Sequence, residues 1–195
     1  MPLALLALIA FAFHREAGLF VVRNADPLAA TLPGDRLLVS RWPYRRHPPG
    51  RGDLVVTTNP LALGRVVAEP GEAFDVTERG WALNGRALLR WRVADAGPAC
   101  SAADCRQRWA ALFPDGRVLV LPRLAVGRFR IGADRLLLLD GAGTLALHPV
   151  ADVAGQAGPV VFSLDPSQAA GGRAWFGAVR WARTGLPLGG ARLIG

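Results

Sequence analysis

Lysine is absent from this chain of 195 residues, so all 23 basic residues are arginines. The absence excludes serine–lysine dyads, Schiff-base chemistry and P-loop phosphate binding, because each of them needs a lysine ε-amine. A formal charge of +8 would by itself suggest a nucleic-acid partner. Abundant Ala, Gly, Pro and Arg with few Asn, Ile and Tyr are what GC-rich codons produce, so we give the charge little weight as evidence about partners.

Cysteine and histidine are also scarce. The two cysteines, Cys100 and Cys105, are close enough in sequence to close a small loop, and the three histidines are scattered along the chain. Because a tetrahedral zinc site needs more ligands close together, we expect neither a metal site nor a cofactor. We expect a Cys100–Cys105 disulfide in an oxidising compartment, with two reduced buried thiols as the alternative.

Long apolar runs are limited to one segment, residues 2–13, which ends at the polar residues 14–16. A helix over this segment measures ~18 Å, against ~30 Å of bilayer hydrocarbon. Three interpretations stay open: a cleaved signal peptide, a membrane anchor that is tilted or begins upstream, and a buried core helix. With 51% hydrophobic residues and a mean hydropathy of +0.26, the composition excludes disorder and favours membrane association.

After residue 16, short Val- and Leu-rich runs alternate with Gly, Pro and Asp, which is typical of a mainly β protein. The sequence Asp140-Gly141-Ala142-Gly143 predicts a hairpin turn. One helix is expected to begin at Ser101, where Ser101 to Asp104 match a capping box, and to continue through the sequence CRQRWAALF. Strands are expected over 36–41, 53–57, 65–68, 73–77, 87–93, 117–121, 128–131, 135–139, 144–148 and 160–163.

Four short motifs follow one another between Phe20 and Leu88. They are a Gly-Asp turn before a Leu- and Val-rich run, an Arg-Gly-Asp before Leu-Val-Val, an Arg-Val-Val run with a following Pro-Gly, and an Asn-Gly hairpin. In this order, after an apolar N-terminal segment, they resemble the sequence boxes of type I signal peptidases, membrane-anchored serine peptidases that remove leader peptides from exported proteins. The motif residues are Gly34, Asp35, Arg51, Gly52, Asp53, Arg65, Pro70, Gly71, Asn84 and Gly85.

The resemblance implies the architecture of the chain. Residues 1–16 would form an N-terminal hydrophobic helix that serves as an anchor or signal segment. Residues 17–88 and 160–195 would form a signal-peptidase-like antiparallel barrel core, and residues 89–159 a variable inserted β lobe. The bulk of a membrane-anchored chain of this kind would lie on the periplasmic or extracytoplasmic side.

The resemblance also implies a serine nucleophile and a lysine or histidine general base, and neither is found. Counting back from Gly34-Asp35, the nucleophile position falls on Asp26. Counting from Arg65, the general-base position falls on Gly64, which has no side chain to accept a proton. We therefore expect a catalytically inactive relative.

Its expected partner is an extended segment of an exported or membrane protein, and one possible role is that of an accessory subunit of a membrane complex. The alternative is an active endopeptidase with non-standard residues, in which Asp26 would act as a nucleophile or with His47 or His148. A carboxylate attacking an amide would give a mixed anhydride, which makes this alternative chemically unattractive. A third hypothesis, a nucleic-acid binder, depends only on the discounted charge.

The densest basic cluster, Arg41–Arg51, interleaves Trp42 and Tyr44 with arginines and prolines. The prolines indicate a loop, for which a membrane surface, bulk solvent and a nucleic acid are the alternatives. Among the six tryptophans, Trp81 and Trp91 are expected in the core. The sequence near the C-terminus offers membrane-interface anchors. These candidate anchors are Trp175, Phe176 and Trp181.

Overall fold

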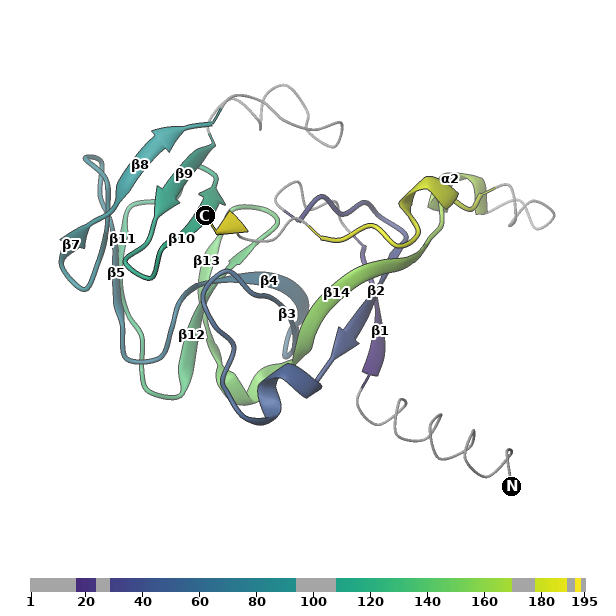
Figure 1. Ribbon diagram of the computed structural model, residues 1–195, viewed down its shortest axis with the longest axis horizontal. Helices are drawn as coiled ribbons and strands as arrows, with labels where there is room; N and C mark the ends of the chain where they lie inside the picture. Colours follow the sequence, from purple (N-terminus) through teal and green to yellow (C-terminus); the bar gives the residue numbers. More distant parts are fainter. Residues whose placement is uncertain (1–16, 24–28, 94–107, 170–177, 189–191, 194–195) are drawn as a thin grey trace.

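The computed structural model describes residues 17–23, 29–93, 108–169, 178–188 and 192–193. These residues form antiparallel sheets joined by turns, with only short helical segments (Figure 1). The expected mainly β fold is therefore confirmed. The expected hydrophobic helix within residues 1–16 lies outside the described residues, and so does the Cys100–Cys105 pair.

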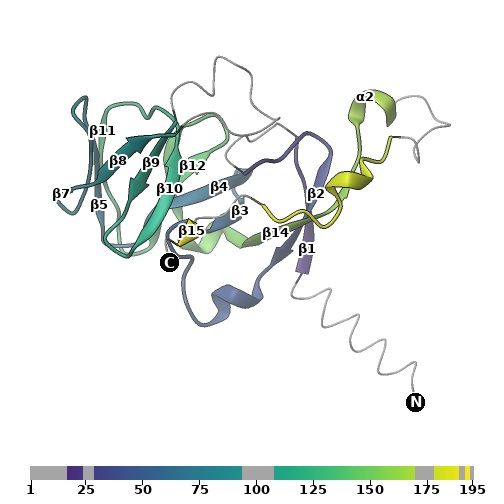
Figure 2. The same ribbon diagram turned by 45° about the horizontal axis from the view of Figure 1, so that its top comes forward.

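A seven-stranded sheet forms the larger part of the molecule, in the order β1-β2-β14-β3-β4-β12-β13 with every neighbouring pair antiparallel. Figure 2 shows that this sheet curves, with β1 and β2 at the end remote from the other sheets. Its strands are β1 (Ala17–Val21), β2 (Asp35–Ser40), β3 (Leu54–Thr58), β4 (Leu61–Ala68), β12 (Arg135–Asp140), β13 (Leu145–Pro149) and β14 (Val153–Ser163).

Strand β12 is buried on both faces, which explains its unbroken run of leucines. Because successive side chains of a strand point to opposite faces, Leu137 and Leu139 pack in one core, while Leu136 and Leu138 pack in another. The first core extends into the smaller sheets. The second core includes Val66 of β4.

Two four-stranded sheets, with the orders β15-β10-β9-β8 and β11-β5-β6-β7, form a lobe beside β4 and β12 (Figures 1 and 2). Phe74, Trp81 and Phe113 of this lobe share the core that contains Leu137 and Leu139. The lobe strands are β5 (Ala73–Val76), β6 (Trp81–Leu83), β7 (Arg86–Ala87), β8 (Leu89–Arg92), β9 (Trp109–Leu112), β10 (Arg117–Leu121), β11 (Gly127–Arg130) and β15 (Arg192–Leu193).

The helical segments are single turns that connect or follow strands. They are the 3₁₀ turns η1 (Trp42–Arg45), η3 (Val150–Asp152) and η4 (Trp181–Arg183), and the short helix α2 (Pro166–Ala169). None of the helices in the described ranges is long and apolar enough to cross a membrane.

The expected barrel does not close in the described part of the chain. There β1 pairs only with β2, and β13 pairs only with β12, so the seven-stranded sheet stays open at both ends. The central strand β14 changes register where it passes β2 and β3, and such irregularities increase the local twist. The sheet therefore curls without joining its two edges.

The expected helix is wrong where the structure describes it. Trp109–Leu112 form strand β9, paired with both β8 and β10, so sheet pairing overrides the helical preference of the Ala-rich sequence. Trp81 is buried as expected, but Trp91 is 40% exposed, because its edge strand β8 turns that side chain outward. The expected hairpin turn at Asp140 is confirmed, since Asp140 Oδ1 accepts bonds from two turn N–H groups.

The sheets also cross the segment boundaries expected from the sequence. Strands β12 and β13, together with the first half of β14, belong to the seven-stranded sheet, although the inserted lobe was expected to extend to residue 159. Conversely, β5, β6 and β7 belong to the lobe, although the barrel core was expected to extend to residue 88. Apolar runs identify strands, but they do not reveal with which distant strand each one pairs.

Candidate functional site

The structure describes one of the two positions expected for the catalytic pair. Asp26 lies outside the described residues. Gly64 lies in the middle of β4, opposite Val55 of β3 and Asp140 of β12, and it is buried. A Cβ at this position would lie 3.3 Å from Leu138 Cβ, so packing favours glycine here and leaves little room for a base.

A buried polar cluster joins β2, the end of β14 and the C-terminal segment. Asp35 and Ser163 are completely buried, and the Ser163 hydroxyl donates to Asp35 Oδ1 at 2.5 Å. Arg183 donates to both Asp35 oxygens, at 2.6 and 3.2 Å, and the Leu32 N–H donates to Oδ2 at 2.9 Å. Arg180 Nε donates to Ser163 Oγ at 2.9 Å. We call these four side chains the Asp35 cluster: Asp35, Ser163, Arg180 and Arg183.

Burial acts to raise the pKa of Asp35, but the hydrogen bonds from Arg183, Ser163 and Leu32 and the Arg183 charge outweigh it and lower the pKa. Such a carboxylate is a poor proton acceptor for Ser163. The Ser163 oxygen is also occupied by Arg180 and shielded from solvent. This arrangement stabilises the fold by connecting distant segments. Ser163 has neither the general base nor the access to substrate that nucleophilic catalysis needs.

A second buried cluster surrounds Arg51, whose side chain is only 4% exposed. Its guanidinium donates to both Glu72 carboxylate oxygens at 2.6 Å and to Asp115 at 2.8 Å, and it lies 4.8 Å from the centre of the Phe113 ring. The Arg51 N–H donates to Glu69 Oε1 at 2.7 Å. This Arg51 cluster connects the loop before β3 with the lobe.

The remaining motif residues stabilise turns and loops. Gly34 has φ of +89°, and a Cβ there would overlap the Leu164 carbonyl oxygen, so only glycine fits. Asp53 accepts bonds from the Tyr44 hydroxyl and the Gly50 N–H, both at 3.0 Å, and Arg65 donates to the Gly52 carbonyl. Two further turns contain the motif residues Gly71 (φ +83°), beside Pro70, and Asn84-Gly85 (φ +50° and +77°).

A groove follows the edge strand β1. It consists of two adjoining hollows, of about 580 and 520 Å³, which share Phe20, Val21, Arg23 and Leu61 as lining residues. One hollow continues to the β12–β13 turn, and the other to Val39 and Val56. Leu61 is 63% exposed, so this groove has an open, largely apolar wall beside β1. We call it the β1 groove.

The backbone of β1 can accept another strand. The Val22 N–H donates to the Asp35 carbonyl at 2.8 Å, which orients the backbone of Val22, Phe20 and Gly18 toward β2. By alternation, the N–H and C=O groups of Leu19 and Val21 point away from β2. A Cβ at Gly18 would meet no atom within 4 Å, so the groove is open at that point too.

Sequence reasoning missed the strand β1 and the partners of Asp35. Asp35 and Arg183 are far apart in the sequence, and no local sequence pattern predicts that they form an ion pair. The short continuous apolar run Leu19-Phe20-Val21-Val22 was a usable signal for a strand. No three His, Cys, Asp or Glu side chains come together as a metal site in the described ranges.

A scan against protein-family models found no match, and a search of curated proteins found no similar protein. The resemblance to type I signal peptidases therefore depends on the sequence motifs alone.

Proposed function

We propose that this protein is a catalytically inactive, signal-peptidase-like protein that binds an extended segment of an exported or membrane protein in the β1 groove. The observation that carries the proposal is the edge of β1, which pairs only with β2 among the described strands and lies beside a largely apolar hollow. An extended segment adds to such an edge through main-chain hydrogen bonds, while neighbouring pockets take alternate side chains. Binding of this kind needs no catalytic residue.

The absence of catalysis is supported by two observations. The chain has no lysine, and the general-base position is Gly64, packed against Leu138. The buried Ser163 is held between Asp35 and Arg180 and has no access to solvent. An accessory role in a membrane complex is consistent with a groove that can hold a segment without cleaving it.

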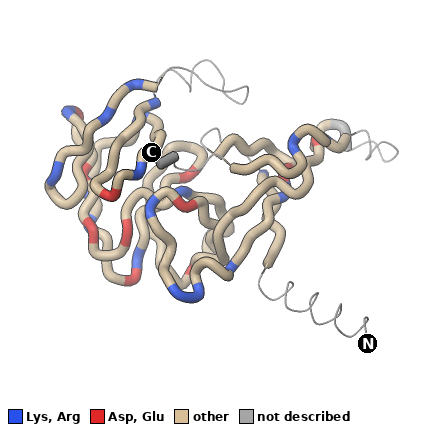
Figure 3. The backbone as a smooth tube through the Cα atoms, viewed as in Figure 1, with Lys and Arg blue, Asp and Glu red and all other residues tan. Residues whose placement is uncertain are grey.

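Membrane association is part of the same proposal, and the bulk of the chain would lie on the extracytoplasmic side. Ala17, which follows the apolar N-terminal sequence, pairs with Ser40 of β2, and Trp42 lies two residues beyond. Trp42 is 67% exposed, and Arg45 stacks 5.2 Å from the centre of its ring. Exposed Trp beside several arginines favours an anionic lipid interface. In Figure 3, basic residues lie in the loop at the bottom of the view, and others are spread over the lobe and the rest of the chain.

The edge-strand proposal can be tested with a fluorescently labelled leader peptide and the purified full-length protein in detergent. Replacement of Val21 by proline removes an N–H that points away from β2, so it should spare the β1–β2 ladder and weaken peptide binding about tenfold. Val21→Ala removes side-chain contacts only and serves as the matched control. Equal affinities of wild type and Val21→Pro, measured by fluorescence anisotropy, would contradict binding by strand addition.

The same peptide tests for catalysis. We expect no cleavage product after long incubation with the wild-type protein. Cleavage by the wild-type protein that is lost in Asp26→Ala would contradict the proposal that the protein is inactive, and it would identify Asp26 as a catalytic residue. A Gly64→Lys change is unsuited to restoring activity, because its Cβ would press against Leu138.

A further inference from the structure

The lobe contains a second groove, separate from the β1 groove, of about 640 Å³. Arginines from two places converge on it: Arg90 and Arg92 from β8, and Arg123 from the segment after β10. Glu78 is the acidic residue in its lining. This strong excess of positive charge indicates an anionic ligand.

Arg90 is positioned by its neighbours. Its guanidinium lies 4.7 Å from the centre of the Trp109 ring and 5.7 Å from the centre of the Trp81 ring, and one Nη donates to the Arg79 carbonyl at 3.1 Å. Two aromatic rings and one carbonyl hold the group in place. A planar guanidinium contacted in this way keeps N–H donors along its edge, which is the geometry that a carboxylate accepts.

The backbone beside this groove is also an edge. Among the described strands, β8 pairs only with β9. The Val93 N–H donates to the Arg108 carbonyl, so alternation turns the Arg90 backbone away from β9 and toward the unpaired side. Val126, which lines the groove and is 68% exposed, offers an apolar contact there.

We propose that this lobe groove binds an extended acidic segment of a partner protein, with its carboxylates at Arg90, Arg92 and Arg123. This site goes beyond the function proposed for the β1 groove. The groove's two tryptophan rings are already stacked against Arg90, so they are poorly placed to stack on the bases of a single-stranded nucleic acid. The exposed aliphatic side chain of Val126 suits a peptide better than a phosphate backbone.

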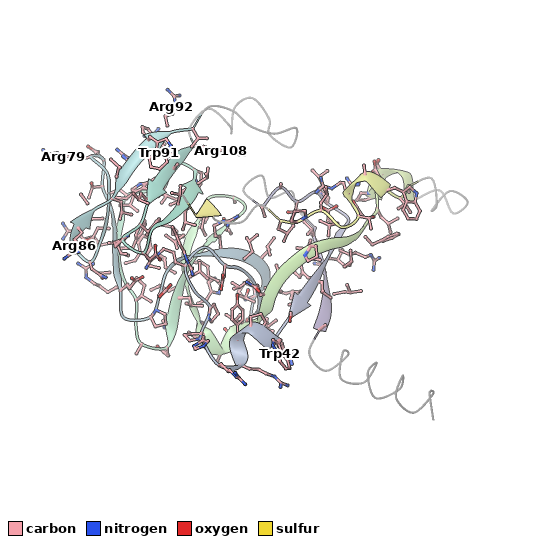
Figure 4. All side chains as sticks on the ribbon, in the orientation of Figure 1. Trp42, Arg79, Arg86, Trp91, Arg92 and Arg108 are labelled. Carbon is pink, nitrogen blue, oxygen red and sulfur yellow. The ribbon has the colours of Figure 1, made fainter. Side chains whose placement is uncertain are left out.

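Figure 4 shows Arg79, Arg86, Arg92 and Arg108 on the lobe, at a distance from Trp42 at the bottom of the view. The lobe groove, to which Arg92 contributes, is therefore separate from the exposed Trp42.

The test uses the full-length protein and a short labelled peptide in which Glu and Leu alternate, compared with the same peptide carrying Gln for Glu. We expect Arg123→Glu to weaken binding of the Glu peptide about tenfold, because it replaces attraction by repulsion at the groove. Arg135→Glu is the matched control, since Arg135 is exposed on β12 outside the groove. Arg123 is exposed as well, so both variants should fold, which near-ultraviolet circular dichroism would check.

Several results would overturn the inference. They are equal loss of binding in Arg123→Glu and Arg135→Glu, equal affinity for the Gln peptide, or no binding of the Glu peptide. Tighter binding of a random single-stranded DNA with the same dependence on Arg123 would assign the groove to nucleic acid. Val21→Pro should leave binding of the Glu peptide unchanged, which separates this site from the β1 groove.

Discussion

The two buried charge clusters have opposite arrangements of charge. In the Asp35 cluster a buried carboxylate is surrounded by Arg180 and Arg183, whereas in the Arg51 cluster a buried guanidinium is surrounded by carboxylates. The first ties the C-terminal segment to the start of β2. The second ties the loop before β3 to the lobe. Each cluster satisfies its central charge, which the interior would otherwise penalise heavily.

The difference teaches how to interpret the sequence motifs. Asp35 and Arg51 both belong to the stretches that resemble type I signal peptidases, yet in this structure both connect distant parts of the chain. Both residues therefore have structural roles in this fold. Motifs that contain such residues carry little information about catalysis.

The largest effect is expected from Arg51→Met. Removing the buried guanidinium leaves Glu72 and Asp115 facing each other without their shared cation, at an expected cost of about 3–5 kcal/mol in the free energy of unfolding. Urea denaturation followed by tryptophan fluorescence measures it. Arg130→Met is the matched control, because the Arg130 side chain of its ion pair with Asp75 is 64% exposed, so the pair should contribute less than about 1 kcal/mol. Similar losses in both variants would remove the distinction between buried and exposed pairs.

Asp35→Asn tests the Asp35 cluster. In the wild-type protein, the loss of stability at acidic pH should show the contribution of the same carboxylate. Since the folded pKa of Asp35 is lowered from its ordinary value near 3.8, its contribution is present above that pH and is lost as the pH falls toward the folded pKa. Stability of the wild type should therefore fall as the pH is lowered below about 5. Asp35→Asn should be less stable at neutral pH and show a shallower decline. If the wild type and Asp35→Asn lost stability equally steeply as the pH falls, a stabilising role of the Asp35 carboxylate would be contradicted.

Ser163→Ala removes one neutral member of the Asp35 cluster while keeping its charges. We expect a loss of about 1–3 kcal/mol in the free energy of unfolding, smaller than for Asp35→Asn, because Asp35 keeps its bonds from Arg183 and Leu32. Thermal denaturation of both variants measures the order. A Ser163→Ala variant as damaged as Asp35→Asn would show that the hydroxyl matters more than the ion pairs.

Tyr44 donates an uncharged hydrogen bond to Asp53 in the loop before β3. We expect its replacement to have the smallest effect on the free energy of unfolding at neutral pH. Burial, the Asp53 charge and the hydrogen bond to Asp53 raise the pKa of Tyr44 above its ordinary value near 10. Its contribution is therefore complete below pH 10 and is lost as the pH rises further. Tyr44→Phe should cost about 1 kcal/mol at pH 7 and reduce the alkaline loss of stability. An identical alkaline decline in both proteins would contradict this assignment.

The sequence predicted most of the strands and the turn at Asp140, because these depend on local alternation and on turn residues. Arg36–Arg41, for example, matched β2 within one residue. It did not predict that Trp109–Leu112 form a strand, since pairing with β8 and β10 decides that segment. The Asp35 cluster was also beyond local reasoning, because only the folded chain brings Ser163 and Arg183 to Asp35. Gly64 fell just outside the expected strand 65–68, whereas it lies inside the longer strand β4.

The position of β14 in the middle of the large sheet affects how the protein is made. Hairpins β1–β2 and β3–β4 leave the ribosome early, but they do not pair with each other in the sheet, because β14 lies between them. At ~5–20 residues per second, about 5–20 s of synthesis pass between the emergence of Thr58 and that of Val153. During this interval the apolar faces of both hairpins lack their central partner. The nascent chain therefore has a period in which a holding chaperone, or export machinery that keeps the chain extended, would protect it from aggregation.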